Sequence, residues 1–235
     1  MVEKAVKDML EEYRVIPFVK LAMYLEASQM SEKYVIIFDK TEQADKYFQY
    51  KATLKDFHSD VMNVRLGEKT KEEALEVLRR GIVYSMRIGD NFVVNTGKLL
   101  IDWEKEWTDP ALFPVEIFNR EEWREREQFI KIVTEEENIG LEGEKNAYDM
   151  RDKWNLVLLA QYTSDEELML ATKLIPNWDD CAKFIIQDGS LLTPEQQAIA
   201  DKQKLIGGGE PEKEEGITSK NIESFKNYSV GYNKF

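Results

Sequence analysis

The segment that decides the fold covers residues 34–48 and reads YVIIFDKTEQADKYF. Its first part, residues 34–38, is continuously apolar and rich in β-branched side chains, which is typical of a strand buried on both faces of a parallel sheet. Farther along, Ala44 and Phe48 recur at helical spacing and belong to one apolar face. The segment therefore predicts a buried strand that turns directly into a helix over residues 43–52.

The turn between strand and helix is Asp39-Lys40-Thr41-Glu42. Nucleotide-binding α/β domains hold a phosphate at such a junction, because a helix N-terminus offers free N–H groups and the positive end of the helix dipole. These turns need glycines so that the backbone can approach the phosphate. Here the turn has two carboxylates and no glycine. The sequence predicts the frame of a nucleotide-binding domain without its phosphate chemistry.

The sequence allows two roles for Asp39 in this turn. Asp39 follows the end of a strand, where α/β sheets place ligands, so it is a candidate catalytic acid or metal ligand. It is equally placed to cap the helix or to shape the turn, and we favour this interpretation. If a nucleotide binds, the candidate contacts are Asp39, Thr41 and Gln43.

The remaining pattern predicts an α/β fold with a mainly parallel five-stranded sheet and flanking helices. The expected strands are residues 34–38, 61–65, 91–95, 154–160 and 182–187, and the expected helices include 43–52, 70–89, 121–134 and 164–174. Capping boxes are predicted at Thr70 with Glu73 and at Ser164 with Glu167.

We expect four regions along the chain. Residues 1–33 form an N-terminal helical segment, in which Val19, Ala22, Met23 and Leu25 recur at helical spacing after Pro17. Residues 34–192 form the α/β domain and residues 193–206 a short helix. Residues 207–235 begin with Gly207-Gly-Gly209 and are expected to be a flexible linker and a C-terminal anchoring tail.

Composition restricts the function. The 235 residues carry 45 acidic and 32 basic side chains and a net charge of −13, which opposes non-specific binding to nucleic acids or anionic membranes. The longest apolar runs fall short of the roughly 20 residues of a membrane span. With a single cysteine, Cys181, and a single histidine, His58, neither a disulfide framework nor a Cys/His metal cluster is expected. A cytoplasmic protein without cofactor or metal is the expectation.

Two groups of aromatic residues are candidate partner-binding sites. The first is in the tail, where Phe225, Tyr228, Tyr232 and Phe235 lie three or four residues apart and Lys226 lies among them. That spacing suits a segment that becomes ordered on a partner, and the alternative is a frayed terminus. The second is Trp103 with Trp107, which we weigh equally as a docking patch and as core or loop-anchoring side chains.

The series Asp39-x-x-x-Gln43-Ala44-x-x-Tyr47-Phe48 after an apolar strand resembles the strand-turn-helix of degenerate AAA+ modules in dynein heavy chains. The resemblance continues in order along residues 34–187. Residues 89–97 correspond to the Walker B strand, residues 155–160 to the strand of the first sensor, and residues 182–187 to the strand after it. A P-loop-like domain of ankyrin-repeat IQ-motif proteins in ciliated cells is similar.

The chain departs from this family where ATP is handled. A Walker A motif needs a Gly-rich turn ending in Gly-Lys-Ser/Thr, which residues 39–43 lack. A Walker B strand needs an acid to hold Mg²⁺, and here the strand carries Asn95 instead. We therefore expect no enzyme, but a structural or scaffolding protein. The resemblance implies a setting in the ciliary axoneme on its microtubules, with tubulin or axonemal proteins as partners. The alternative is a module that binds ATP or ADP without hydrolysis.

Overall fold

The computed structural model describes residues 13–140, 142–161 and 164–186, all within one compact unit that spans Met1–Leu191. Within these residues, six strands form one sheet in which every pairing is parallel. They are β1 (Arg14–Ile16), β2 (Val35–Phe38), β3 (Thr53–Asp56), β4 (Asn91–Gly97), β5 (Asn155–Ala160) and β6 (Ala182–Ile186). The order across the sheet is β1-β6-β2-β5-β4-β3.

The predicted α/β class with a parallel sheet is confirmed, and the sheet has six strands rather than five. Strand β2 lies inside the sheet, where Ile37 is opposite Leu159 of β5 and opposite Phe184 of β6. All four β2 residues are buried, as the continuously apolar pattern predicted. Strand β3 forms one edge of the sheet, β4 and β5 step back toward β2, and β6 lies on the other side of β2, next to β1. The neighbouring strands β2 and β5 are therefore followed by strands on opposite sides, β3 after β2 and β6 after β5.

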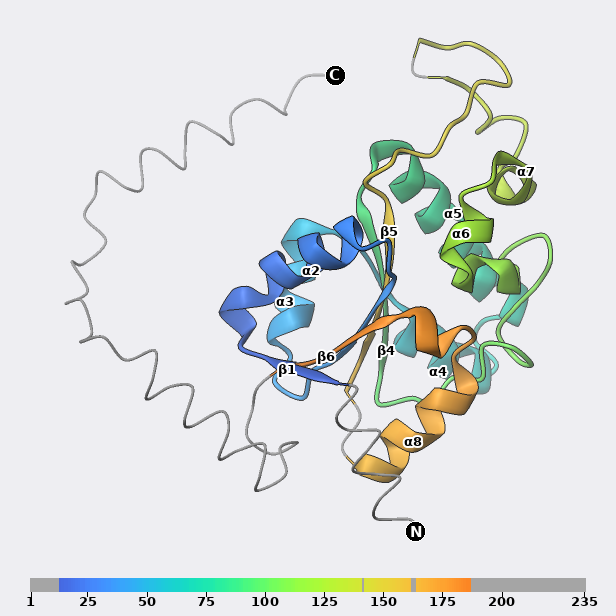
Figure 1. Cartoon of the computed structure of the whole chain (residues 1–235). Coiled ribbons are helices and arrows are strands. Elements are labelled where there is room, and N and C mark those ends of the chain that lie inside the picture. Colours follow the sequence, from blue (N-terminus) through green and yellow to red (C-terminus); the bar gives the residue numbers. More distant parts are fainter. Residues whose placement is uncertain (1–12, 141, 162–163, 187–235) are drawn as a thin grey trace, which may run out of the picture. The chain divides into compact units, whose positions relative to one another are not determined.

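Alternate residues of each strand serve two separate cores, one on each face of the sheet. One core holds Val35 and Ile37 against α2 (Leu21–Met30) and α3 (Gln43–Lys51). The other holds Ile36 and Phe38 against α4 (Phe57–Arg65), α5 (Lys71–Ile88) and α8 (Asp165–Leu174). Figure 1 shows α2 and α3 together on one side of the sheet and the other helices on the opposite side.

Both predicted capping boxes are confirmed. Thr70 Oγ1 accepts a hydrogen bond from Glu73 N at 3.1 Å, while the Glu73 carboxylate accepts from Thr70 N at 2.7 Å. Ser164 and Glu167 make the same reciprocal pair at the start of α8. These contacts satisfy N–H groups that a helix start leaves without intrahelical partners.

The strand predicted over residues 61–65 is wrong, because these residues belong to helix α4. The strand comes earlier, as β3, which pairs with β4. Phe57 and Val61 are fully buried and lie four residues apart, which is a helical spacing. Asp56 fixes the helix start by accepting from Ser59 N at 3.1 Å.

The single helix predicted over residues 121–134 is also wrong. The segment forms three short pieces, α6 (Arg120–Trp123), α7 (Arg126–Phe129) and the 3₁₀ turn η3 (Ile130–Ile132). Between α6 and α7, Glu125 adopts extended angles of φ −67° and ψ 128°. The break lets Trp123 and Phe129 both enter the core below α5, which one straight helix would not permit.

The N-terminal segment differs from prediction in two ways. Residues 14–16 form strand β1, which pairs with β6 and was not expected. After Pro17 the chain makes the 3₁₀ turn η1 (Phe18–Lys20) and then α2, whose buried residues are Leu21, Leu25 and Ser28. Of the predicted apolar face only Leu25 is buried, and Val19 is 86% exposed.

Further short 3₁₀ turns are η2 (Val115–Phe118) and η4 (Trp178–Asp180). Within the residues described, no helix has both the length and the apolar character needed to cross a membrane.

Candidate functional site

The candidate site is the carboxyl edge of the sheet around Asp39, the residue that follows β2. In open α/β sheets, ligands bind outside the carboxyl ends of the strands, at the point where the strand order reverses. Asp39 lies at that point because the chain continues from β2 to β3 on one side and from the adjacent β5 to β6 on the other. Its N–H donates to Ala160 O at 2.9 Å, which ties the turn to the end of β5.

The Asp39 side chain is buried and accepts hydrogen bonds from the turn and from the start of α3. Oδ1 accepts from Thr41 N at 2.7 Å and from Thr41 Oγ1 at 2.6 Å. Oδ2 accepts from Ala44 N at 2.7 Å. The side chain is only 1% exposed, so these bonds are shielded from water. The turn-shaping role of Asp39 is confirmed.

The other residues of the turn complete this arrangement. Glu42 adopts left-handed angles, with φ 58°, immediately before α3, and its side chain does not cap the helix. Thr41 Oγ1 accepts from Gln43 N at 3.4 Å. The N–H groups of Thr41 and Ala44 are directed at the Asp39 carboxylate. A carboxylate of the chain thus lies where a bound phosphate would need those donors.

The end of β4 is likewise occupied by contacts within the protein. Asn95 donates through Nδ2 to Asp45 Oδ1 of α3 at 2.7 Å and accepts from Gly97 N at 2.8 Å. Gly97 has φ +55°, and a Cβ built there would lie 2.9 Å from His58 Cδ2. His58 is partly buried at the start of α4 and lies against this strand end.

The polar side chains at this edge are therefore hydrogen-bonded within the protein. Asp39 accepts from backbone N–H groups, and Asn95 donates to Asp45. Among the described residues no cluster of three or more His, Cys, Asp or Glu side chains could hold a metal ion. Cys181 is buried, and burial raises the pKa of its thiol to about 12, which keeps the sulfur protonated. Its Sγ donates to Asn177 O at 3.5 Å.

The docking patch predicted at Trp103 and Trp107 is corrected by the structure. Trp103 is 1% and Trp107 6% exposed, so neither ring is available on the surface. Phe57 stacks on Trp103 with ring centroids 5.2 Å apart and meets Trp107 edge-on at 5.1 Å. Both tryptophans anchor the long loop after β4 to the core, which is the other interpretation. The tail candidates Phe225, Lys226, Tyr228, Tyr232 and Phe235 lie outside the described residues.

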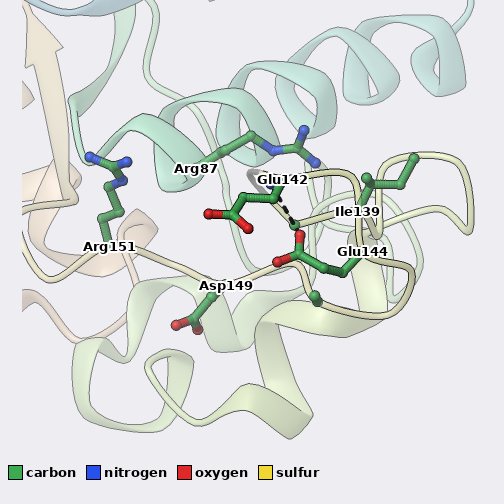
Figure 2. Close-up of a pocket in the computed structure, with 8 residues that line it drawn as sticks. Arg87, Ile139, Glu142, Glu144, Asp149 and Arg151 are labelled. Atoms are coloured by element: carbon green, nitrogen blue, oxygen red, sulfur yellow. Dashed lines mark hydrogen bonds between the residues drawn. The ribbon is translucent and has the colours of Figure 1, made fainter.

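A pocket with a volume of about 360 Å³ lies at the opposite, amino edge of the sheet and was not predicted from the sequence. Figure 2 shows its charged side chains, which come from the end of α5 and from the segment before β5. The lining residues are Arg87, Ile139, Gly140, Glu142, Glu144, Ala147, Asp149 and Arg151. The set mixes both signs of charge and includes no nucleophile. These residues are spread over more than sixty positions of the sequence, so no local motif indicates the pocket.

An ionic cluster ties α5 to the segment below it. Arg79 is 5% exposed and donates to Glu76 Oε2, Glu137 Oε2 and Ile132 O at 2.6, 2.6 and 2.7 Å. The Arg79 side chain, through its hydrogen bond, lowers the pKa of Glu76 to about 2. The pKa of Glu137 is also lowered, because the hydrogen bonds from Arg79 and Thr134 outweigh the cost of its burial.

Comparison of the chain with models of protein families, with curated proteins and with solved structures found no match.

Proposed function

We propose that this chain is a non-enzymatic scaffolding protein with an AAA-like α/β core that docks into a larger assembly. The observation that supports this most directly is the Asp39 carboxylate, which accepts the N–H groups of Thr41 and Ala44 at the start of α3. A nucleotide phosphate placed there would have to displace a buried carboxylate and would be repelled by its charge. The frame of a nucleotide-binding domain is kept for its shape.

The sheet order gives further support for the AAA-like reading. The resemblance assigns β2 to the Walker A strand, β4 to the Walker B strand and β5 to the sensor strand. These three strands are neighbours, with β5 paired to both β2 and β4. At the end of β4, Asn95 is bonded to Asp45 and Gly97, so this position also serves contacts within the protein. Phosphoryl transfer would lack the charged groups on which its rate depends.

The proposed setting is the ciliary axoneme on its microtubules, and it follows from the resemblance alone. The negative net charge suits a partner with a basic docking surface. The proposed anchor is the C-terminal tail, because its four aromatic residues recur at a spacing suited to successive pockets.

Thermal unfolding in the presence of nucleotides tests the non-enzymatic part of the proposal. We expect no change in Tm of the full chain as ATP, ADP or GTP is added with Mg²⁺. A ligand that binds only the folded state must raise Tm progressively with concentration. A saturable rise that inorganic phosphate does not reproduce would replace the proposal with a module that binds nucleotide without hydrolysis, and an Asp39→Asn variant would show whether the α3 start is the site.

A truncation tests the anchoring part. A chain ending at residue 209 retains the whole compact unit of residues 1–191, so its Tm should match that of the full chain. We expect it to lose incorporation into axonemes when expressed in ciliated cells. A full-length control in which Phe225, Tyr228, Tyr232 and Phe235 are replaced by alanine should fail equally. Normal incorporation of either variant would contradict the anchoring role.

A further inference from the structure

Helix α6 and the residue that follows it carry three side chains with hydrogen-bond donors on one side. Arg120, Trp123 and Arg124 are three and four residues apart, so they share one side of the helix. Trp123 is fully buried. Arg124 Nη2 donates to Asp152 O at 2.9 Å and to Trp154 O at 2.7 Å, which places α6 against the residues that lead into β5.

Tyr34, the residue before β2, faces the same place. Its ring meets Trp154 edge-on at a centroid distance of 5.9 Å, and the side chain is 3% exposed. Burial raises the pKa of its hydroxyl, and the positive charges of Arg120 and Arg124 act on the same group and offset part of that rise. The phenol therefore stays protonated and can donate or accept a hydrogen bond as a neutral group.

Four donors in this cluster are buried and have no hydrogen-bond partner among the residues that the structure describes. They are the hydroxyl of Tyr34, Nε of Arg120, Nε1 of Trp123 and Nε of Arg124. A buried donor that stays unsatisfied costs about 1–3 kcal/mol, more when it is charged. Native proteins leave few such groups, so four in one place indicate a ligand of the opposite kind.

The positive charge of the cluster also favours an anionic ligand. Arg120 and Arg124 repel each other, and burial together with this repulsion lowers the pKa of Arg120. The nearest balancing charge is Glu32, whose Oε1 lies 3.7 Å from Arg120 Nη1 and whose side chain is 80% exposed. Among the described residues, Arg124 makes no ion pair. Of the two guanidinium groups, only that of Arg120 thus has a carboxylate partner among the described residues, and that partner is exposed.

We propose that Tyr34, Arg120, Trp123 and Arg124 form a binding site for a small oxyanion of the phosphate or carboxylate type. Guanidinium groups suit such anions because their N–H groups match the spacing of two oxygens. The indole and phenol donors add neutral hydrogen bonds that would hold the anion away from water. The site is at the amino edge of the sheet, and it is therefore distinct from the Asp39 turn at the carboxyl edge.

The test measures Tm of the full chain while chloride is replaced by inorganic phosphate, sulfate or acetate at constant ionic strength. We expect a saturable rise with at least one of them, of several degrees when the anion is far above its Kd. The anion that acts at the lowest concentration identifies the source: phosphate-type or carboxylate-type. Absence of a rise with all three would overturn the proposal.

Three variants localise the effect. Tyr34→Phe removes a hydroxyl that has no hydrogen-bond partner in the described part of the chain, so without added anion its Tm should equal or exceed that of the wild type. With the anion it should gain less. Arg124→Gln should lose the anion-dependent rise. Arg65→Gln is the charge-matched control, since Arg65 is exposed on α4 and should keep the full rise. A rise of the same size in Tyr34→Phe, Arg124→Gln and wild type would show general salt stabilisation and would refute the site.

Discussion

At the residue scale, the Asp39 carboxylate takes the place that a bound phosphate has in nucleotide-binding domains. It accepts hydrogen bonds from N–H groups at the start of α3 and offsets the positive end of the helix dipole. Its local role was readable from the sequence, because an acidic residue between a strand and a helix commonly shapes the turn. Its depth was not. The 1% exposure of Asp39 depends on β5 and β6 closing on both sides of β2, and these strands lie more than a hundred residues away.

Replacing Asp39 with Asn tests how much this carboxylate stabilises the fold. We expect Asp39→Asn to lower the free energy of unfolding by about 2 kcal/mol, because buried hydrogen bonds to a charged acceptor are replaced by weaker ones and one oxygen becomes an N–H donor facing another donor. Urea unfolding measures the change. The matched control is Asp56→Asn, since Asp56 lies at the end of a strand and caps the next helix, yet is exposed. Equal effects in both variants would contradict a special role for Asp39.

A second residue-scale prediction concerns Gly97 at the end of β4. Gly97→Ala should destabilise the protein by more than the roughly 1–2 kcal/mol of a left-handed alanine, because the new Cβ would also lie 2.9 Å from His58 Cδ2. Gly67→Ala is the control, since Gly67 has φ +75° but no atom within 4 Å of a built Cβ. Adding His58→Ala to Gly97→Ala should recover part of the loss. Thermal unfolding of the three variants and wild type checks this, and equal losses for the two glycines would argue against the contact.

At the element scale, α5 shows what sequence patterns predict well. Its capping box, apolar stripe and final glycine are all local, and the helix begins and ends as predicted. The neighbouring segment of residues 120–132 shows the opposite. Its charges and aromatics favour one helix, but the need to bury Trp123 and Phe129 beneath α5 breaks it at Glu125. Tertiary packing decided that element, and packing has no local signature.

The ion cluster that joins α5 to this segment predicts a pH dependence. Glu76 has its pKa lowered to about 2 in the folded protein, so its contribution to stability is present above the ordinary value near 4.5. It is lost as pH falls through the range between 4.5 and 2, where the folded state releases its hold on the carboxylate. Unfolding free energy measured across this range should fall less steeply in Glu76→Gln than in wild type. Glu72→Gln, exposed on the same helix, serves as control. Equal slopes in Glu76→Gln and wild type would refute the assignment.

At the scale of the whole molecule, the class of fold follows from alternating strands and helices, while the candidate sites follow from the sheet order. The sequence could indicate that β2, β4 and β5 exist, but their adjacency appears only in three dimensions. The same holds for the cluster of Tyr34 with Arg120 and Arg124, whose members are about ninety residues apart. Trp103 and Trp107 failed as a surface patch for a related reason. Aromatic residues near a proline-rich loop suit an interface and a core equally, and only packing separates the two.

The place of β6 has a consequence for the way the protein is made. This strand is the last of the described six along the chain, yet it inserts between β1 and β2, the first two. Arg14 pairs with Phe184, so β1 gains its partner only after 170 further residues have been synthesised. Until then one edge of β2 is open, and such an edge can pair with a foreign strand. The nascent chain therefore carries an unfinished sheet until β6 has been synthesised, and over that interval the open edge of β2 is exposed to aggregation.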